Sequence, residues 1–143
     1  EEPMHKWLKK SLEEKGFNVI SPKMPHPETP EINSWVGKLN EVIKNPNEDA
    51  YFIGHSIGCQ TILRYLERLD SNIKIGGVVL IAPFMHLDKK TLEEEGTLEI
   101  ARPWIEKEIK FKKVIVHTNK FVSIFSDNDP DVSLKEKEIF KRS

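Results

Sequence analysis

The sequence contains a single cysteine, Cys59, among 143 residues. One thiol cannot form an internal disulfide, and it excludes a metal site built from several cysteines. Absence of disulfides is typical of proteins from reducing compartments, so we predict a cytoplasmic protein. Because Cys59 lies at helical spacing among apolar residues, we expect it to be a small buried side chain and not a nucleophile.

The sequence also lacks an excess of either charge and a long apolar run. It has 22 Lys and Arg against 23 Asp and Glu, with no basic stripe that would favour nucleic acid or an anionic membrane. No apolar run reaches the roughly 20 residues that span a bilayer. The first residues, EEPMHKW, are acidic where a signal peptide would be basic. We expect a small-molecule substrate, no nucleic acid and no membrane, and the sequence identifies no protein partner.

Apolar residues are instead gathered in short blocks. We predict strands at FNVIS (17–21), AYFIG (50–54), IGGVVLIAP (75–83) and FVSIF (121–125). Helical spacing predicts helices before Gly16, from Ile32 to Ile43, and over about 57–70. Strands that are apolar without alternation are typical of parallel sheets covered on both faces. We therefore predict a single α/β domain over residues 1–143, with an open, mostly parallel sheet and helices on both faces.

The segment 84–119 has a less regular pattern. MHLDKKTLEEEG resembles a helix, whereas RPWIEKEIKFKKV is expected to be a loop that leads into a short helix. We predict that this segment forms a flap or wall over a site.

The motif GHSIG places Ser56 between Gly54 and Gly58, after an apolar strand and before an amphipathic helix. A serine hydroxyl is a poor nucleophile unless it is exposed beside a base and near donors that bind an oxyanion. A GxSxG turn meets these needs, because small residues permit a strained backbone and the helix start directs an amide at the developing charge. We predict that Ser56 is a nucleophile and that the Ile57 amide is an oxyanion donor. The alternative is a serine that caps the helix.

A carboxylate partner for this serine is expected after a later strand. The loop SDNDPDV follows the strand that ends at Phe125, and it offers Asp127, Asp129 and Asp131. The alternative is an ordinary acidic turn, since Asp and Pro are common in loops.

Four residues are predicted to form the substrate pocket. Phe84 and Met85 directly follow the strand block ending LIAP, and we expect them to be pocket walls. His55 precedes the serine and is expected to pack or donate a hydrogen bond near the site. Trp104, in the irregular segment, is predicted to line the same site.

Three sequence blocks together resemble a known family. GHSIGCQTILRYLERL, GGVVLIAPF and FSDNDPDVSL, with the earlier GFNVISPKMPHPETPEINSWV, resemble the small α/β-hydrolase-fold serine hydrolases related to retinoblastoma-binding protein 9. The resemblance covers almost the whole chain. It implies a Ser, Asp and His triad in that chain order, with no metal and no cofactor, and small esters as test compounds. In the family pattern the acid is followed by two residues, an apolar residue and usually proline. Asp129 fits this pattern, although Ser133 replaces the proline, and Asp127 is the alternative acid.

The family order places the catalytic histidine after the acid. All the histidines of this sequence precede Asp129: His5, His26, His55, His86 and His117. The residues after Asp129 are too few for the strand and loop that carry the family's histidine, and the first family strand with its oxyanion loop would precede Glu1. We therefore expect a fragment of a longer chain that lacks both segments. The predicted function is a serine hydrolase that cleaves a small ester, thioester or amide through an acyl-enzyme on Ser56. The alternative is a non-catalytic binding protein on a hydrolase scaffold.

Overall fold

The computed structural model describes residues 3–142, which are built around three parallel strands. The strands are β1 (Tyr51–His55), β2 (Gly77–Ile81) and β3 (Phe121–Ile124), in the spatial order β1-β2-β3. His55 is paired with Ile81, and Ile81 is paired with Ile124. The carboxyl ends of all three strands therefore lie at one edge of the sheet, as the sequence predicts for the last three apolar blocks.

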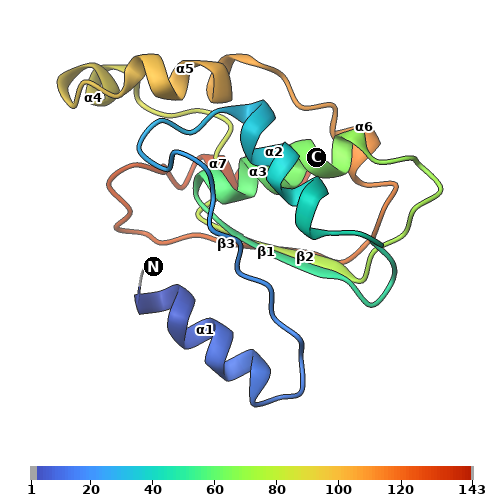
Figure 1. Cartoon of the computed structure of the whole chain (residues 1–143). Coiled ribbons are helices and arrows are strands. Elements are labelled where there is room, and N and C mark those ends of the chain that lie inside the picture. The colour runs from blue at the N-terminus through green and yellow to red at the C-terminus, as the bar shows by residue number, and fades with distance from the viewer. Residues whose placement is uncertain (1–2, 143) are drawn as a thin grey trace.

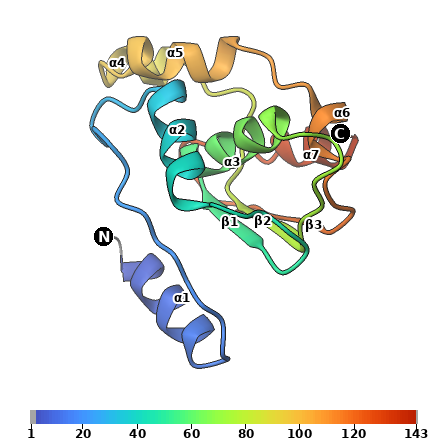
Figure 2. The same ribbon diagram turned by 45° about the vertical axis from the view of Figure 1, so that its right-hand side comes forward.

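Helices lie on both sides of this sheet, although unequally. They are α1 (Pro3–Glu13), α2 (Ile32–Val42), α3 (Ile57–Arg68), α4 (Lys89–Glu94), α5 (Leu98–Glu106), α6 (Phe111–Val114) and α7 (Glu136–Arg142). Figure 1 shows α2, α3 and α6 on one side of the sheet and α1 on the other, and Figure 2 shows the same arrangement after rotation. Within residues 3–142, no helix is both long enough and apolar enough to cross a membrane.

The helix α3 is the centre of the core. Its apolar stripe is buried against β1 and α2, in a cluster that includes Phe52, Trp35, Val36, Cys59, Ile62, Leu63 and Leu66. Each fully buried side chain of Leu or Ile size contributes about 1.5–3 kcal/mol relative to exposure. The helix that follows the GHSIG motif is therefore fixed firmly to the strand that precedes it.

The opposite face of the sheet is only partly covered within the described residues. Tyr51 and Ile53 of β1 are 56% and 38% exposed, and Val122 and Ile124 of β3 are 54% and 50% exposed. The helix α1 lies on this side but contains no buried residue. The unbroken apolar strands predict that helices cover both faces of the sheet. Within the described residues, one face is well covered and the other only partly.

The prediction of a strand at residues 17–21 is wrong. This segment is irregular, and Phe17 and Ile20 are 51% and 61% exposed. A strand requires a hydrogen-bonding neighbour, but in the described sheet β1 is an edge strand that pairs only with β2. The apolar composition of the segment is therefore insufficient to make it a strand here.

The segment 84–119 is more helical than its sequence suggests. MHLDKKTLEEEG contains α4, as predicted, but the predicted loop at RPWIE belongs to α5, and Pro103 lies inside that helix. Proline usually ends a helix because it lacks an N–H. Here the neighbouring Trp104 is buried in the core, and this packing outweighs the local cost.

A buried cation, Arg64, holds α5 against α3. Its Nε donates to Gln60 Oε1 at 3.2 Å, and its Nη2 donates to the carbonyls of Trp104 at 3.0 Å and Lys107 at 2.6 Å. These carbonyls lie at the C-terminal end of α5, where the backbone lacks partners and the helix dipole favours a cation. Arg64 thus fixes the segment that follows β2 to the helix that follows Ser56.

We predict that Arg64→Ala lowers the free energy of unfolding by about 3 kcal/mol, because it removes charged donors and leaves two helix-end carbonyls without their partner. The control is Arg68→Ala, one turn along α3, whose exposed guanidinium donates to Asn33 Oδ1. That change is expected to alter stability by no more than about 0.5 kcal/mol. Urea unfolding gives both values. If the two variants lost the same free energy of unfolding, Arg64 would not be the residue that holds α5 against α3.

Candidate active site

Ser56 occupies a strained turn between β1 and α3. Its backbone has φ 51° and ψ −117°, the unusual conformation that the motif predicts. A non-glycine residue in such a conformation costs about 1–3 kcal/mol, which the surrounding structure must offset. The Ser56 amide donates to the Ile81 carbonyl at 2.9 Å, and the Ser56 carbonyl accepts from the Cys59 amide at 2.9 Å. The strand β2 and the first turn of α3 therefore both hold this residue.

The hydroxyl of Ser56 is not used as a helix cap. Ser56 is the residue that precedes α3, yet its side chain makes no capping hydrogen bond within the described residues. This observation disfavours the capping alternative. Ile57 begins α3, so its amide, next to Ser56 in the chain, lies at the positive end of the helix dipole.

Gly54 permits the close approach of strand and helix. A Cβ at Gly54 would lie 2.8 Å from the Cys59 nitrogen, 2.8 Å from Ile62 Cδ1 and 2.9 Å from the Gly58 carbonyl carbon. Distances of this kind are shorter than van der Waals contact, and two of the three atoms are backbone. A Cβ at Gly58 would meet no described atom within 4 Å. The first glycine of GHSIG is thus required sterically, whereas the described residues give no steric reason for the second.

Asp129 lies in the loop that follows β3, at the same edge of the sheet as Ser56. Its Oδ1 accepts from the amides of Asp131 and Val132, each at 2.9 Å. Val132 is 4% exposed and packs in a small cluster with Ala82 and Phe84, which follow β2. The backbone therefore orients this carboxylate. The loop that carries it packs against the segment that follows the neighbouring strand, β2.

Asp127 has a different environment. It is exposed, and no hydrogen bond or ion pair found among residues 3–142 involves its carboxylate. Of Asp129 and its alternative Asp127, only Asp129 has a carboxylate oriented by backbone hydrogen bonds within the described residues.

The predicted pocket residues fall into two groups. Met85 and His55 are partly exposed, whereas Phe84 is 3% exposed within its cluster. Trp104 is 1% exposed, its Nε1 donates to the Pro30 carbonyl at 2.9 Å, and its ring lies 6.0 Å from that of Trp35. Trp104 is therefore a core residue and not a pocket wall in this structure, because its ring has no open face for a ligand.

The histidines are spread over several parts of the fold. The rings of His5 and His55 meet edge to face at 5.9 Å, which brings α1 to the end of β1. His26 lies in the loop before α2 with φ 43°. His117 is 1% exposed, and its Nδ1 lies 2.8 Å from the Ile73 carbonyl. His86 follows β2, and its Nδ1 lies 3.2 Å from Glu136 Oε1.

Cys59 behaves as the sequence predicts. It is fully buried, its Sγ donates to the Ile81 carbonyl at 3.3 Å, and burial raises the pKa of the thiol to about 12. A thiol is nucleophilic only as the thiolate. Cys59 is therefore held as the thiol at neutral pH, which makes it a poor nucleophile.

One surface depression of the described residues lies away from Ser56. It has a volume of about 580 Å³ and is lined by the loop 23–28 and by Ser34, Gly37, Lys38 and Glu41 of α2. None of the predicted catalytic residues lines it. Among residues 3–142 there is also no group of three or more His, Cys, Asp or Glu side chains that could hold a metal ion.

We predict that Gly54→Ala destabilises the protein by about 1–3 kcal/mol, because the new Cβ forces the first turn of α3 away from β1. Gly37→Ala is the matched control, since Gly37 lies inside α2 and a Cβ there meets no described atom within 4 Å. That variant should gain about 0.5–1 kcal/mol from helix propensity. Urea unfolding curves give both values, and a neutral Gly54→Ala would show that the close approach does not constrain the turn.

Comparisons with known proteins agree with this geometry. A model of the serine hydrolase family matches residues 2–142. A protein of Bacillus subtilis (strain 168) named "Putative hydrolase YdeN" is 36% identical over 78 residues, and the match spans 54% of this chain and 41% of YdeN. The crystal structure of the ydeN gene product superposes with a TM-score of 0.83 at 26% identity, over 96% of this chain and 70% of that one. The fold is therefore an α/β-hydrolase-like fold, and the chain belongs to the serine hydrolase family.

Proposed function

We propose that this protein cleaves a small ester, thioester or amide through an acyl-enzyme on Ser56, as a relative of the retinoblastoma-binding protein 9 group. The observation that carries the proposal is the turn at Ser56. Its backbone is strained, its hydroxyl makes no capping bond within the described residues, and the next residue in the chain, Ile57, begins α3. A serine that served only as a helix cap would not need this conformation.

The chemistry follows from the position of each group. The Ser56 Oγ attacks the substrate carbonyl carbon and passes its proton to an imidazole, while the carbonyl electrons move to the oxygen. The Ile57 amide donates to this oxyanion, where its charge is greatest. The tetrahedral intermediate then collapses, and the leaving group departs with the proton from the imidazole. Water attacks the ester on Ser56 by the same route and regenerates the hydroxyl.

Asp129 is the proposed acid of this mechanism. A triad carboxylate holds the imidazole in one tautomer and stabilises the imidazolium formed during attack. Asp129 Oδ1 is fixed by two backbone amides, and these two bonds do not use Oδ2. The strand order places its loop two strands from Ser56, with the loop after β2 between them. The family order assigns the imidazole to a position after Asp129 in the chain.

The substrate is proposed to be small. His55 and Met85 end or follow strands at the edge that carries Ser56, and these partly exposed residues are the proposed neighbours of the scissile bond. Phe84 is proposed to support this wall from its buried cluster. The mechanism requires neither a metal nor a cofactor. The cytoplasmic location remains a prediction from the single cysteine.

The full-length natural protein should be labelled covalently by a fluorophosphonate, and Ser56→Ala should abolish the labelling, because only an activated serine reacts at a useful rate. Ser71→Ala is the control, since Ser71 is an exposed serine just beyond α3. Mass spectrometry of the labelled peptide identifies the site. Undiminished labelling of Ser56→Ala would rule out Ser56, and absence of labelling in the parent protein would favour a non-catalytic binding role.

Asp129→Asn should lower the kcat of ester hydrolysis by about 10⁴-fold, because the amide favours the wrong imidazole tautomer. Asp127→Asn is a matched change two positions earlier in the same loop, and it should leave kcat within about threefold because exposed surface substitutions have small effects. The two variants are compared with a chromogenic acetate ester. The reverse ranking would assign the acid to Asp127.

A further inference from the structure

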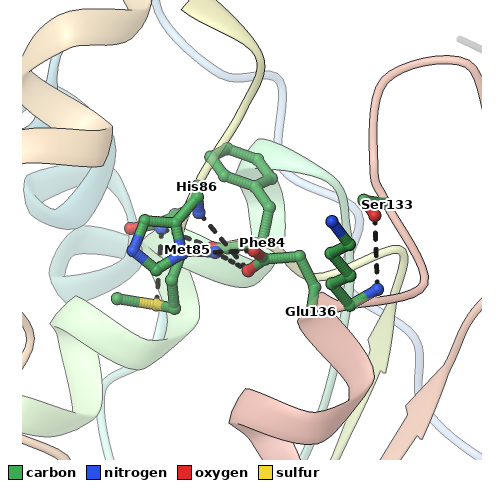
Figure 3. Close-up of polar contacts among 7 residues, drawn as sticks. Phe84, Met85, His86, Ser133 and Glu136 are labelled. Atoms are coloured by element: carbon green, nitrogen blue, oxygen red, sulfur yellow. Dashed lines mark hydrogen bonds and ion pairs between the residues drawn. The ribbon is translucent and has the colours of Figure 1, made fainter.

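Glu136, the first residue of α7, has an unusually buried carboxylate. The residue is 4% exposed. Its Oε2 accepts from the amide of Met85 at 2.6 Å and from the amide of His86 at 3.3 Å, while its Oε1 lies 3.2 Å from His86 Nδ1 (Figure 3). A buried carboxylate is tolerated only when such bonds replace its water. Glu136 is thus bonded to a segment that is distant in sequence.

The burial is specific to this position on α7. Glu138, two residues later, has a side chain 59% exposed and pairs with Lys141 at the surface. A glutamate at the start of a helix can remain in water at no cost. The sequence did not single out Glu136, because one acidic residue in a charged helix gives no periodic signal.

The segment that Glu136 binds is also held from the other side. Gln60 is fully buried on α3, one turn after Ser56, and its Nε2 donates to the Phe84 carbonyl at 2.7 Å. The residues Phe84, Met85 and His86 follow the central strand β2, between the turn at Ser56 and the loop of Asp129. We call Phe84–His86 the bridging segment. It is bonded to the nucleophile helix by Gln60 and to the helix after the acid loop by Glu136.

We propose that Glu136 is a positioning residue that sets the placement of Asp129 relative to Ser56 through the bridging segment. This inference rests on the proposed function. The charged acceptor makes stronger bonds to the amides than a neutral one would. Without it, α7 and the acid loop would be attached to the bridging segment mainly by the apolar contact of Val132 with Ala82 and Phe84. A displacement of about 1 Å between catalytic groups can cost up to about 100-fold in rate.

The bonds to the backbone amides, and not the contact with the His86 ring, carry this role. The His86 side chain is 73% exposed, so water screens its interaction with the carboxylate. The amides of Met85 and His86 belong to the backbone that Gln60 holds from the other side. His86→Ala removes the ring but keeps the two backbone amides, so it should lower kcat much less than Glu136→Gln does.

The test uses Glu136→Gln in the full-length natural protein, with Glu138→Gln as the matched control. For Glu136→Gln we expect kcat for a chromogenic ester to fall about 10- to 100-fold, because the catalytic pair is displaced, with a smaller change in KM from the loosened segment at Met85. Amide hydrogen exchange should accelerate at Met85 and His86 in this variant alone. If Glu136→Gln does not fold, Gln60→Met releases the bridging segment from α3 and should give the same split between kcat and KM.

The outcomes separate this inference from the proposed function. A parent protein that neither reacts with a fluorophosphonate nor hydrolyses esters overturns both. A reactive parent protein whose kcat is unchanged by Glu136→Gln, despite faster exchange at the two amides, overturns only the positioning role. The positioning role is also overturned if amide hydrogen exchange at Met85 and His86 is unchanged in Glu136→Gln. It is overturned as well if His86→Ala lowers kcat as much as Glu136→Gln does.

Discussion

The backbone of Ser56 has φ 51° and ψ −117°, which serine adopts only where its surroundings compel it. Ser56 lies at the end of β1 and at the start of α3 because the chain turns within this one residue. The conformational cost, about 1–3 kcal/mol, is offset by bonds from the turn to Ile81 and Cys59 and by the absence of a side chain at Gly54. The arrangement of the other elements is what keeps this turn in place.

The turn depends on α3, and α3 depends on its buried face. Leu63 and Leu66 fix the helix against β1 and α2, while Gln60 and Arg64 bind backbone carbonyls of the segment after β2. The parallel register then brings the ends of β1, β2 and β3 to one edge. Packing on one helix therefore determines both the strain at Ser56 and the position of the loops that surround it.

The sequence predicts this turn well because its requirements are local. A glycine two residues before the serine, an apolar strand and an amphipathic helix are all visible in one short segment. The failure at FNVIS has the opposite cause, since a strand exists only beside another strand and its composition says nothing about a neighbour. The segment that contains Trp104 has no regular apolar pattern, so its sequence does not show that the indole is buried in the core by α5. The amide bonds that distinguish the environment of Asp129 from that of Asp127 cannot be read from the sequence, and the burial of Glu136 leaves no pattern there either.

The most direct test of this account is the crystal structure of the full-length natural protein after reaction with a fluorophosphonate. The account predicts phosphorus bonded to Ser56 Oγ, with a phosphonyl oxygen about 2.7–3.1 Å from the Ile57 nitrogen. The strained backbone of Ser56 should be unchanged, since a preorganised turn does not rearrange on reaction. An adduct on another residue, or a phosphonyl oxygen directed away from the start of α3, would contradict the account.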